Sequence, residues 1–314
     1  MIRVGELHDH LVKRVIGQNQ AVAVLAEALM AGEMGHTPRG RPKTFALLAG
    51  PTGTGKTKAV LEASRFLFGT EAVARVNCAE FATDARVPLL LGTEGKRGLL
   101  GATLDDLRAS GGKILLLDEI EKANRMVSDL FLGMEAAEIT LGNNEKVDLS
   151  DFHILNTSNV GSADLADLDE GVPWPTLKWV VETAAKEQFR PEVFARFTHL
   201  AIFNKHGNKA QLAICEQMLT EEVEFQRRTL AQQFGHEHTL GVGPGVYRRL
   251  VSEGFHPLLG MRPMRNVVEQ RVRNAIVRAR RNGVLVPGVS ESWLVLEGND
   301  VKVAAARRGL RLVG

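Results

Sequence analysis

The sequence predicts an α/β protein in which a parallel sheet lies between helices, followed by a second, smaller and mainly helical domain. Short apolar stretches alternate with helical patterns over residues 44–203, as they do when helices connect parallel strands. One of these stretches runs directly into a glycine-rich turn. Beyond residue 203 the pattern changes to long helices. We therefore expect two domains, residues 1–203 and 204–314.

Each expected strand of the first domain is a short apolar run that ends in glycine or polar residues. The strands are expected at 44–50 (TFALLAG), 72–78 (AVARVNC), 113–119 (KILLLDE) and 152–159 (FHILNTSN). Helices are expected over residues 21–32, which are rich in helix formers, and 56–68, whose apolar residues have helical spacing. Because ligands bind at the carboxyl ends of parallel strands, the residues at those ends should share one site.

The second domain shows two helical patterns and one hairpin. The helices are expected over residues 210–234 and 262–281, and the hairpin turns at Gly298-Asn299. Residues 241–314 hold 13 Lys/Arg and 5 Asp/Glu, a net charge of +8, within a chain whose net charge is +2. Basic charge is therefore concentrated near the C-terminus.

Composition excludes several classes of protein. The chain has 314 residues, 44% of them hydrophobic, which is enough for a substantial core. We expect no signal peptide and no membrane span, because no long apolar run occurs. Its two cysteines lie far apart without metal-ligand spacing, which is typical of buried thiols in a reducing compartment. The expected location is the cytoplasm.

The stretch GPTGTGKT at residues 50–57 fits the phosphate-binding pattern GxxxxGK[ST]. Its glycines allow a tight turn whose N–H groups point inward, and the following helix adds its positive end. Lys56 would reach the β- and γ-phosphates of ATP, and Thr57 would ligate Mg²⁺. An ordinary glycine-rich turn is the alternative. The expected nucleotide-binding residues of this loop are Gly50, Pro51, Thr52, Gly53, Thr54, Gly55, Lys56 and Thr57.

Two carboxylates follow the apolar run at residues 114–117. Asp118 is expected to hold Mg²⁺, and Glu119 to act as the base that polarises the attacking water. Asn159, at the end of another strand, would orient that water, contact the γ-phosphate or merely cap a turn. Glu121 and Lys122 are expected to be solvated or paired with other charges.

Arginine is the third requirement of phosphoryl transfer, because negative charge on the γ-phosphate must be balanced. Arg196 lies in FRPEVFARF and Arg262 in GMRPMRN. A single arginine is usually a surface charge, but a neighbouring subunit often supplies the one that completes such a site.

Together, RVIGQNQAV, GPTGTGKT, LLLDEIEKA, TSNVG, FRPEVFARF and GMRPMRN occur in this order and resemble the Clp-type AAA+ ATPases. The similarity is greatest to the second nucleotide-binding module of the double-ring unfoldases and disaggregases, and it covers residues 13–305. It implies an AAA+ large domain over 1–203, a small domain over 204–314, and a homo-oligomeric, hexameric ring.

The resemblance also implies roles for individual residues. Asn159 matches the first sensor, Arg196 the arginine finger that acts on the neighbouring subunit, and Arg262 the second sensor. Val15 and Ile16 match residues beside the adenine. ATP and Mg²⁺ are the implied cofactors.

Two segments depart from the family. Gly95-Lys96-Arg97-Gly98 carries charges where the substrate-gripping pore loop has an aromatic residue, and six copies would form a positive ring. Alternatively, the loop is only exposed. No Ile-Gly-Phe/Leu loop follows Asn159, so we expect no Clp peptidase partner. Trp174 and Trp179 are expected to pack onto the domain, with partner binding as the alternative.

Two functions remain. The first is a chaperone-like, ring-forming ATPase that hydrolyses ATP to remodel a protein or protein complex. The sequence does not identify its substrate or adaptor. The second is a nucleic-acid-associated AAA+ ATPase that loads DNA or serves a mobile element, because the tail and candidate loop are basic. Stimulation of ATP hydrolysis by DNA, weakening steeply with salt, would distinguish the second from the first.

Overall fold

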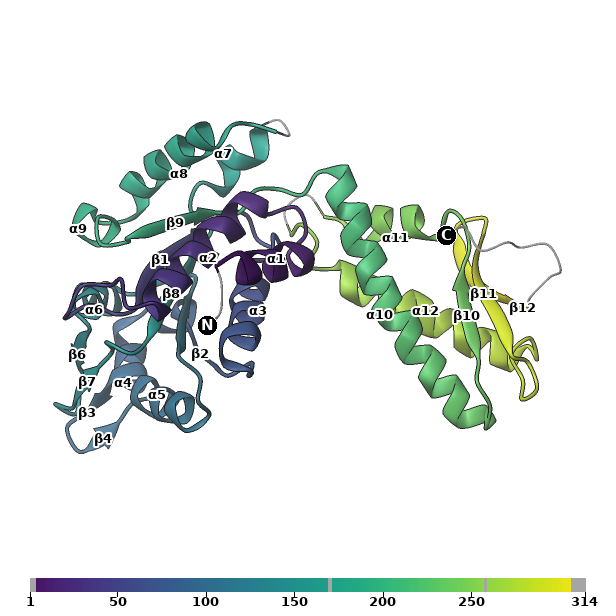
Figure 1. Ribbon diagram of the computed structural model, residues 1–314, viewed down its shortest axis with the longest axis horizontal. Helices are drawn as coiled ribbons and strands as arrows, with labels where there is room; N and C mark the ends of the chain where they lie inside the picture. The colour runs from purple at the N-terminus through teal and green to yellow at the C-terminus, as the bar shows by residue number, and fades with distance from the viewer. Residues whose placement is uncertain (1–3, 169–170, 257–258, 306–314) are drawn as a thin grey trace. The chain divides into compact units, whose positions relative to one another are not determined.

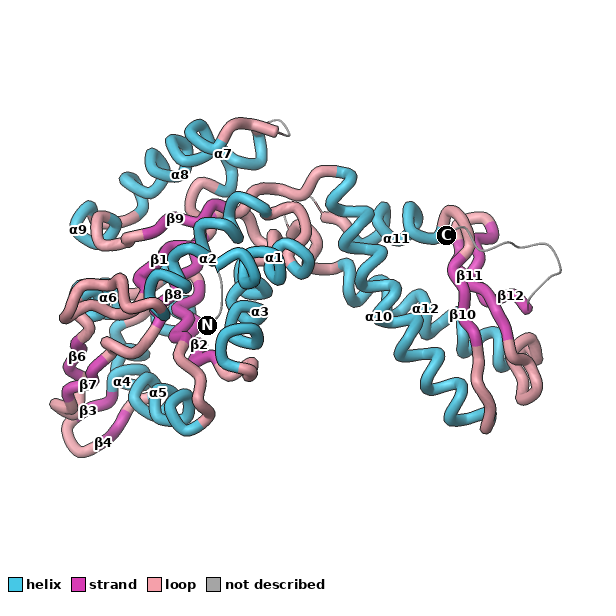
Figure 2. Tube along the Cα trace, viewed as in Figure 1, coloured by secondary structure: helices cyan, strands magenta, loops and turns pink. Residues whose placement is uncertain are grey.

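The computed structural model describes residues 4–168, 171–256 and 259–305 (Figure 1). The chain divides into two compact units, Met1–Lys205 and His206–Gly314. The first unit is a five-stranded parallel sheet between helices, and the second is helical with a three-stranded sheet (Figure 2). The α/β fold class with a mainly helical second part is therefore confirmed.

The parallel sheet has the strand order β2-β5-β8-β1-β9. Its strands are β1 (Thr44–Ala49), β2 (Val73–Asn77), β5 (Ile114–Asp118), β8 (His153–Ser158) and β9 (His199–Ile202). The glycine-rich loop that starts at Gly50 follows β1, Asp118 ends β5 with Glu119 directly after it, and Asn159 follows β8. Because β5, β8 and β1 are neighbours and parallel, these three ends meet at one edge of the sheet.

Helices cover both faces of the sheet. On one face lie α1 (Val4–Arg14), α2 (Asn19–Glu33) and α3 (Lys56–Phe68). The other face is covered by residues from α4 (Val87–Leu91), α5 (Leu99–Ala109), α6 (Arg125–Glu135), α7 (Ser162–Asp167), α8 (Trp174–Gln188) and α9 (Pro191–Phe194). Successive strand residues point to opposite faces, so Leu47 joins one core and Leu48 the other. This explains why the strands are apolar throughout.

Short elements connect these layers. They are the single turns η1 (Cys78–Phe81), η2 (Asp84–Arg86) and η3 (Ile120–Lys122), and two hairpins, β3 (Gly92–Thr93) with β4 (Lys96–Arg97) and β6 (Glu138–Thr140) with β7 (Lys146–Asp148). The candidate loop 95–98 thus comprises the end of the turn, the strand β4 and Gly98, the N-cap of α5.

The second unit contains α10 (Asn208–Phe234), α11 (Val246–Gly254) and α12 (Met264–Arg281). Strands β11 (Glu291–Glu297) and β12 (Asp300–Ala305) form the expected antiparallel hairpin. A third strand, β10 (Thr239–Val242), pairs parallel to β11 and was not predicted. Its sequence, TLGV, is too short and mixed to show periodicity. Among the described residues, no helix combines the length and apolar character needed to cross a membrane.

Candidate functional site

Two glycines of the loop between β1 and α3 have positive φ angles that would be strained for any other residue, and a side chain at Gly50 would also clash with backbone. Gly50 has φ 134°, and a Cβ there would lie 1.9 Å from the carbonyl oxygen of Phe203. Gly55 has φ 102°, and a Cβ there would lie 3.2 Å from Cγ1 of Val15. The backbone can therefore curl back over the end of β1 only because glycine stands at these positions.

We predict that Gly50→Ala destabilises the protein by at least about 3 kcal/mol, because left-handed strain and a clash with rigid backbone add together. Gly95→Ala is the matched control, since Gly95 also has positive φ (72°) but no atom within 4 Å of an added Cβ. It should cost about 1–2 kcal/mol. Urea unfolding of both variants measures the difference, and equal losses would contradict the role assigned to the Phe203 contact.

Lys56, at the start of α3, directs its ammonium back into the loop. Its Nζ donates to the carbonyl oxygens of Gly50 (2.5 Å) and Pro51 (3.0 Å) and to Oδ1 of Asn159 (3.2 Å). Burial lowers the pKa of Lys56 to about 8, against the opposing effect of Glu121, Asp118 and Glu119. The loop therefore holds a buried ammonium, which attracts phosphate, and three carboxylates lie near it, whose oxygens are suited to a divalent cation.

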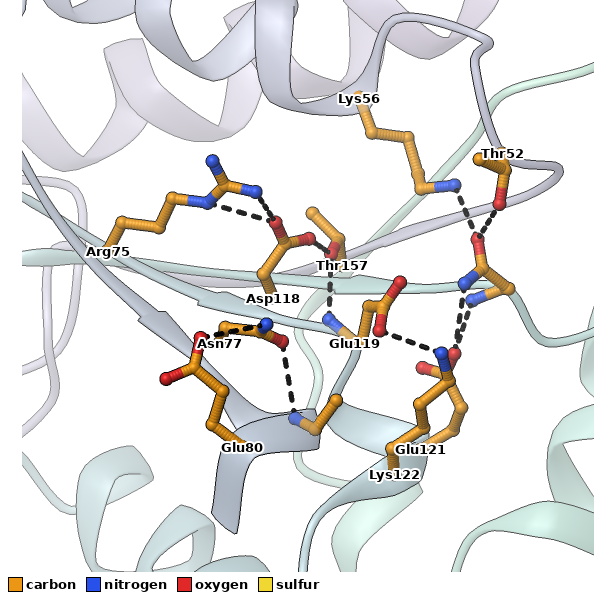
Figure 3. A network of polar contacts seen from close by, with 12 residues as sticks. Thr52, Lys56, Arg75, Asn77, Glu80, Asp118, Glu119, Glu121, Lys122 and Thr157 are labelled. Carbon is orange, nitrogen blue, oxygen red and sulfur yellow. Dashed lines mark hydrogen bonds and ion pairs between the residues drawn. The ribbon is translucent and has the colours of Figure 1, made fainter. Parts of the chain in front are cut away.

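Asp118, the last residue of β5, is buried, and both of its carboxylate oxygens have partners (Figure 3). Oδ1 accepts a hydrogen bond from the hydroxyl of Thr157. Oδ2 accepts from Nη2 (2.5 Å) and Nε (3.1 Å) of Arg75, which lies on the neighbouring strand β2. An ionised carboxylate at a strand end offers the oxygen chemistry that Mg²⁺ prefers.

Glu119 follows Asp118 in a left-handed conformation, with φ 56° and ψ 48°. Its backbone N–H donates to Thr157 Oγ1 (3.1 Å), and its carboxylate pairs with Lys122 Nζ (2.8 Å). Left-handed backbone is rare for residues other than glycine and is concentrated at functional sites. Here it turns the chain sharply after β5, so that Asp118 and Glu119 leave the strand in different directions (Figure 3).

Asn159 connects the phosphate loop to the segment after β5. Its Oδ1 accepts from Lys56 Nζ and from Thr52 Oγ1, both at 3.2 Å. Its backbone N–H and Nδ2 donate to Oε1 of Glu121 at 3.2 and 3.1 Å. The hydrogen bonds between Glu121 and Asn159 were not expected from the sequence, whereas Lys122 pairs with the charge of Glu119 as expected.

The remaining residues expected around the nucleotide lie near this loop. Val15 is buried and contacts the position of Gly55, whereas Ile16 is half-buried in the turn that follows α1. Thr54 donates from Oγ1 to the carbonyl oxygen of Pro51 (2.8 Å) and supports the turn. Gly53 has φ 76°, and Thr57 is half-buried in the first turn of α3.

Arg196 contacts a different group of residues from those around Lys56. It follows α9, is exposed, and pairs with Glu135 at the end of α6. The other oxygen of the buried Glu135 carboxylate pairs with Arg41 at 2.6 Å. Arg262 belongs to the second unit, where it is exposed in the turn that precedes α12.

The candidate loop does not present two free positive charges. Arg97 pairs with Asp105 and with Glu145 (2.6 Å), and Lys96 is exposed in β4. The expectation of a dense positive ring is not supported by this pairing.

The two tryptophans differ in exposure. Trp174 packs against the core as expected, but Trp179 is 67% exposed on α8, so the packing expected for Trp179 is wrong.

Three contributors to the site were not found from the sequence: Arg75, Thr157 and Glu121. Arg75 and Asn77 share one face of β2, and Thr157 and Asn159 are likewise two residues apart at the end of β8. This period of two is the signal that could have drawn attention to Arg75 and Thr157. The partners of Arg75 and Thr157 lie on other strands, so the period of two shows only which face of the sheet these two side chains occupy.

The fold and the loop define a phosphate-binding ATPase of the AAA class. Residues 41–200, just over half of the chain, match the family described as "AAA domain (Cdc48 subfamily)", and residues 212–290 match the "C-terminal, D2-small domain, of ClpB protein". The chain belongs to this AAA family and has the make-up of a ClpB second module. It is accordingly an ATP-binding ATPase domain, and the Clp-type resemblance is confirmed.

Individual relatives agree with this assignment. The chaperone protein ClpB of Vibrio cholerae is 30% identical over 298 residues, covering 93% of this chain and 34% of the relative. The chloroplastic ClpB2 of Oryza sativa is 31% identical over 287 residues, covering 88% and 29%. This chain thus spans about a third of the length of these relatives.

A solved structure shows the same fold. A closed-state cryo-EM reconstruction of Hsp104 with ATPγS and FITC-casein superimposes with a TM-score of 0.77 at 24% identity, covering 96% of this chain and 51% of that one. The likeness therefore extends over both units of the chain.

Proposed function

We propose that this chain is a ring-forming ATPase that hydrolyses ATP to remodel a protein or protein complex. The observation that carries the proposal is the meeting of Lys56, Asp118, Glu119 and Asn159 at the carboxyl ends of three neighbouring strands. The curated relatives are named chaperone proteins, which supports a protein as the substrate.

Each residue has a distinct task in this proposal. Lys56 donates to the phosphates in place of the loop carbonyls, and the backbone N–H groups of residues 52–57 surround them. Glu119 accepts the proton of the attacking water. Val15 and Ile16 lie beside the adenine.

The donor set fits Mg²⁺, because Asp118 offers a carboxylate and Thr57 a hydroxyl oxygen. When bound, the ion would supply positive charge to the phosphate oxygens. Arg75 at Oδ2 and Thr157 at Oδ1 keep the Asp118 carboxylate hydrogen-bonded and oriented.

We further propose that each site is shared between two subunits of a hexameric ring. Arg196 is exposed and pairs with Glu135 rather than with its own phosphate loop, which suits a side chain that acts on a neighbour. Residues 1–203 would form the large ATP-binding domain and 204–314 the small domain that carries Arg262 as the second sensor. No peptidase is expected to dock, because the Ile-Gly-Phe/Leu loop is missing after Asn159.

Nucleic acid is the less supported partner. Arg97 of the candidate loop is paired with two carboxylates. On α12, Arg265, Arg271 and Arg278 also pair with acidic side chains. Less positive charge is therefore available to bind the phosphate backbone of a nucleic acid than the number of arginines implies.

Lys56→Ala tests the proposed site directly. We predict that affinity for ATP falls about a hundredfold or more, because charge-assisted hydrogen bonds to phosphate are lost from a buried position. Fluorescence titration with a labelled ATP analogue measures this affinity. Lys146→Ala is the control, since Lys146 is an exposed lysine that pairs with Glu138 in the β6–β7 hairpin. Equal affinities in the two variants would rule out the proposed loop.

A further inference from the structure

The side-chain amide of Asn159 is held in one orientation by partners of opposite character. The ammonium of Lys56 can only donate hydrogen bonds, so the amide atom that faces it must be the oxygen. The ionised carboxylate of Glu121 can only accept them, so the atom that faces it must be Nδ2. These two constraints agree, and together they determine which way the amide points.

Glu121 lies in η3, directly after the turn made by Glu119. Its Oε1 accepts two hydrogen bonds from a single residue, the backbone N–H and Nδ2 of Asn159. Its Oε2 is buried and has no hydrogen-bond partner among the described residues. A carboxylate oxygen buried without a partner is costly, so its retention calls for a function.

We propose that Glu121 is a positioning residue for ATP hydrolysis, holding Asn159 so that its amide oxygen faces the phosphate loop. This inference rests on the proposed function of the site. A phosphate oxygen would be repelled by an amide oxygen, whereas an ammonium or a water hydrogen is attracted to it. Glu121 thereby makes Asn159 act on Lys56 and on the attacking water rather than on the γ-phosphate.

Glu121 also lies close enough to Lys56 to stabilise its charge. Positioning and charge are separable, because glutamine keeps a carbonyl oxygen that can accept both bonds from Asn159 but carries no charge. Alanine removes both. The pair Glu121→Gln and Glu121→Ala therefore distinguishes a positioning residue from a simple counter-charge.

The experiment measures kcat and KM for ATP in four variants: Glu121→Ala, Glu121→Gln, Asn159→Ala and the double alanine variant. Misplacing a catalytic group costs about tenfold to a hundredfold in rate. We expect Glu121→Ala to lower kcat by that amount with KM changed less than about threefold, and Glu121→Gln to keep most of kcat. In the double variant, kcat should match Asn159→Ala alone, because the positioning effect of Glu121 operates through Asn159.

Two further measurements make the result decisive. Hydrogen exchange of the Asn159 side-chain amide, followed by NMR, should be slow in the wild type and in Glu121→Gln and fast in Glu121→Ala. Thermal unfolding checks that each variant is folded, and Glu138→Ala, which removes an exposed carboxylate of the β6–β7 hairpin, serves as the activity control.

The inference is overturned if Glu121→Ala turns over ATP at the wild-type rate, if the two alanine effects multiply in the double variant, or if Glu121→Gln is as slow as Glu121→Ala. Failure of the proposed function has a different signature, because the wild-type protein itself would then not hydrolyse ATP.

Discussion

Replacing Arg196 by alanine is expected to lower kcat for ATP about a thousandfold while the same protein still binds the nucleotide. An arginine brought to the γ-phosphate stabilises charge that develops in the transition state, so its loss affects turnover more than binding. Arg196 stands exposed beside Glu135, outside the hydrogen-bonded group that contains Lys56. The expected result therefore depends on its reaching a neighbouring copy.

Steady-state hydrolysis and titration with a labelled nucleotide measure the two quantities separately. Arg190→Ala is the matched control, because Arg190 caps the same helix α9 and pairs with Asp129. Mixing Arg196→Ala with Lys56→Ala should restore measurable activity, since the second variant donates the arginine that the first lacks. Full-speed hydrolysis by Arg196→Ala, or by an isolated monomer, would contradict a shared site.

The second large effect is expected for Glu119→Gln, which should bind ATP with near wild-type affinity but hydrolyse it about a hundredfold to ten-thousandfold more slowly. Glutamine has nearly the same shape and can occupy the same left-handed backbone position at equal cost. It cannot take a proton from water, so the chemical step is lost while the ATP-bound state persists. Assembled rings should consequently accumulate.

Single-turnover hydrolysis and light scattering in the presence of ATP measure turnover and assembly. Glu80→Gln is a suitable control, because Glu80 is near the site and, within the described part of the chain, its carboxylate accepts from the side chain of Asn77 (3.2 Å). Wild-type turnover by Glu119→Gln would show that another group serves as the base. Loss of ATP binding would instead show that the substitution disturbs the loop.

Much of the first unit is predictable because the local pattern of apolar residues matches the burial of each strand and helix in the folded unit. The helix expected at residues 56–68 occurs as α3, Lys56–Phe68, and the four expected strands occur within a residue or so of their predicted ends. Buried parallel strands must be apolar on both faces, so they appear as continuous apolar runs. The polar residues that end those runs then mark the edge at which Lys56, Asp118 and Asn159 meet.

Predictions failed where the partner of a residue lies far along the chain. The partner of Arg75 is 43 residues away, and those of Thr157 and Asn159 are 39 and 38 residues away. Arg97 resembles a free charge in the sequence, yet it is neutralised by Glu145, which is 48 residues away. Trp179 resembles a core residue by its type, but the other face of α8 is the one that packs.

By itself, the amino-acid order determined the fold class, the glycine-rich turn after β1 and the two acidic residues at the end of β5. These depend on glycine conformation, the periodicity of apolar residues and the chemistry of single side chains, all of which are local. Only the tertiary structure decided the contacts between distant residues. Glu121 hydrogen-bonds to Asn159, and Thr157 and Arg75 donate hydrogen bonds to the carboxylate of Asp118. Arg196 pairs with Glu135. Hydrogen bonds and ion pairs depend on distance in space, and chain folding sets that distance independently of separation in sequence.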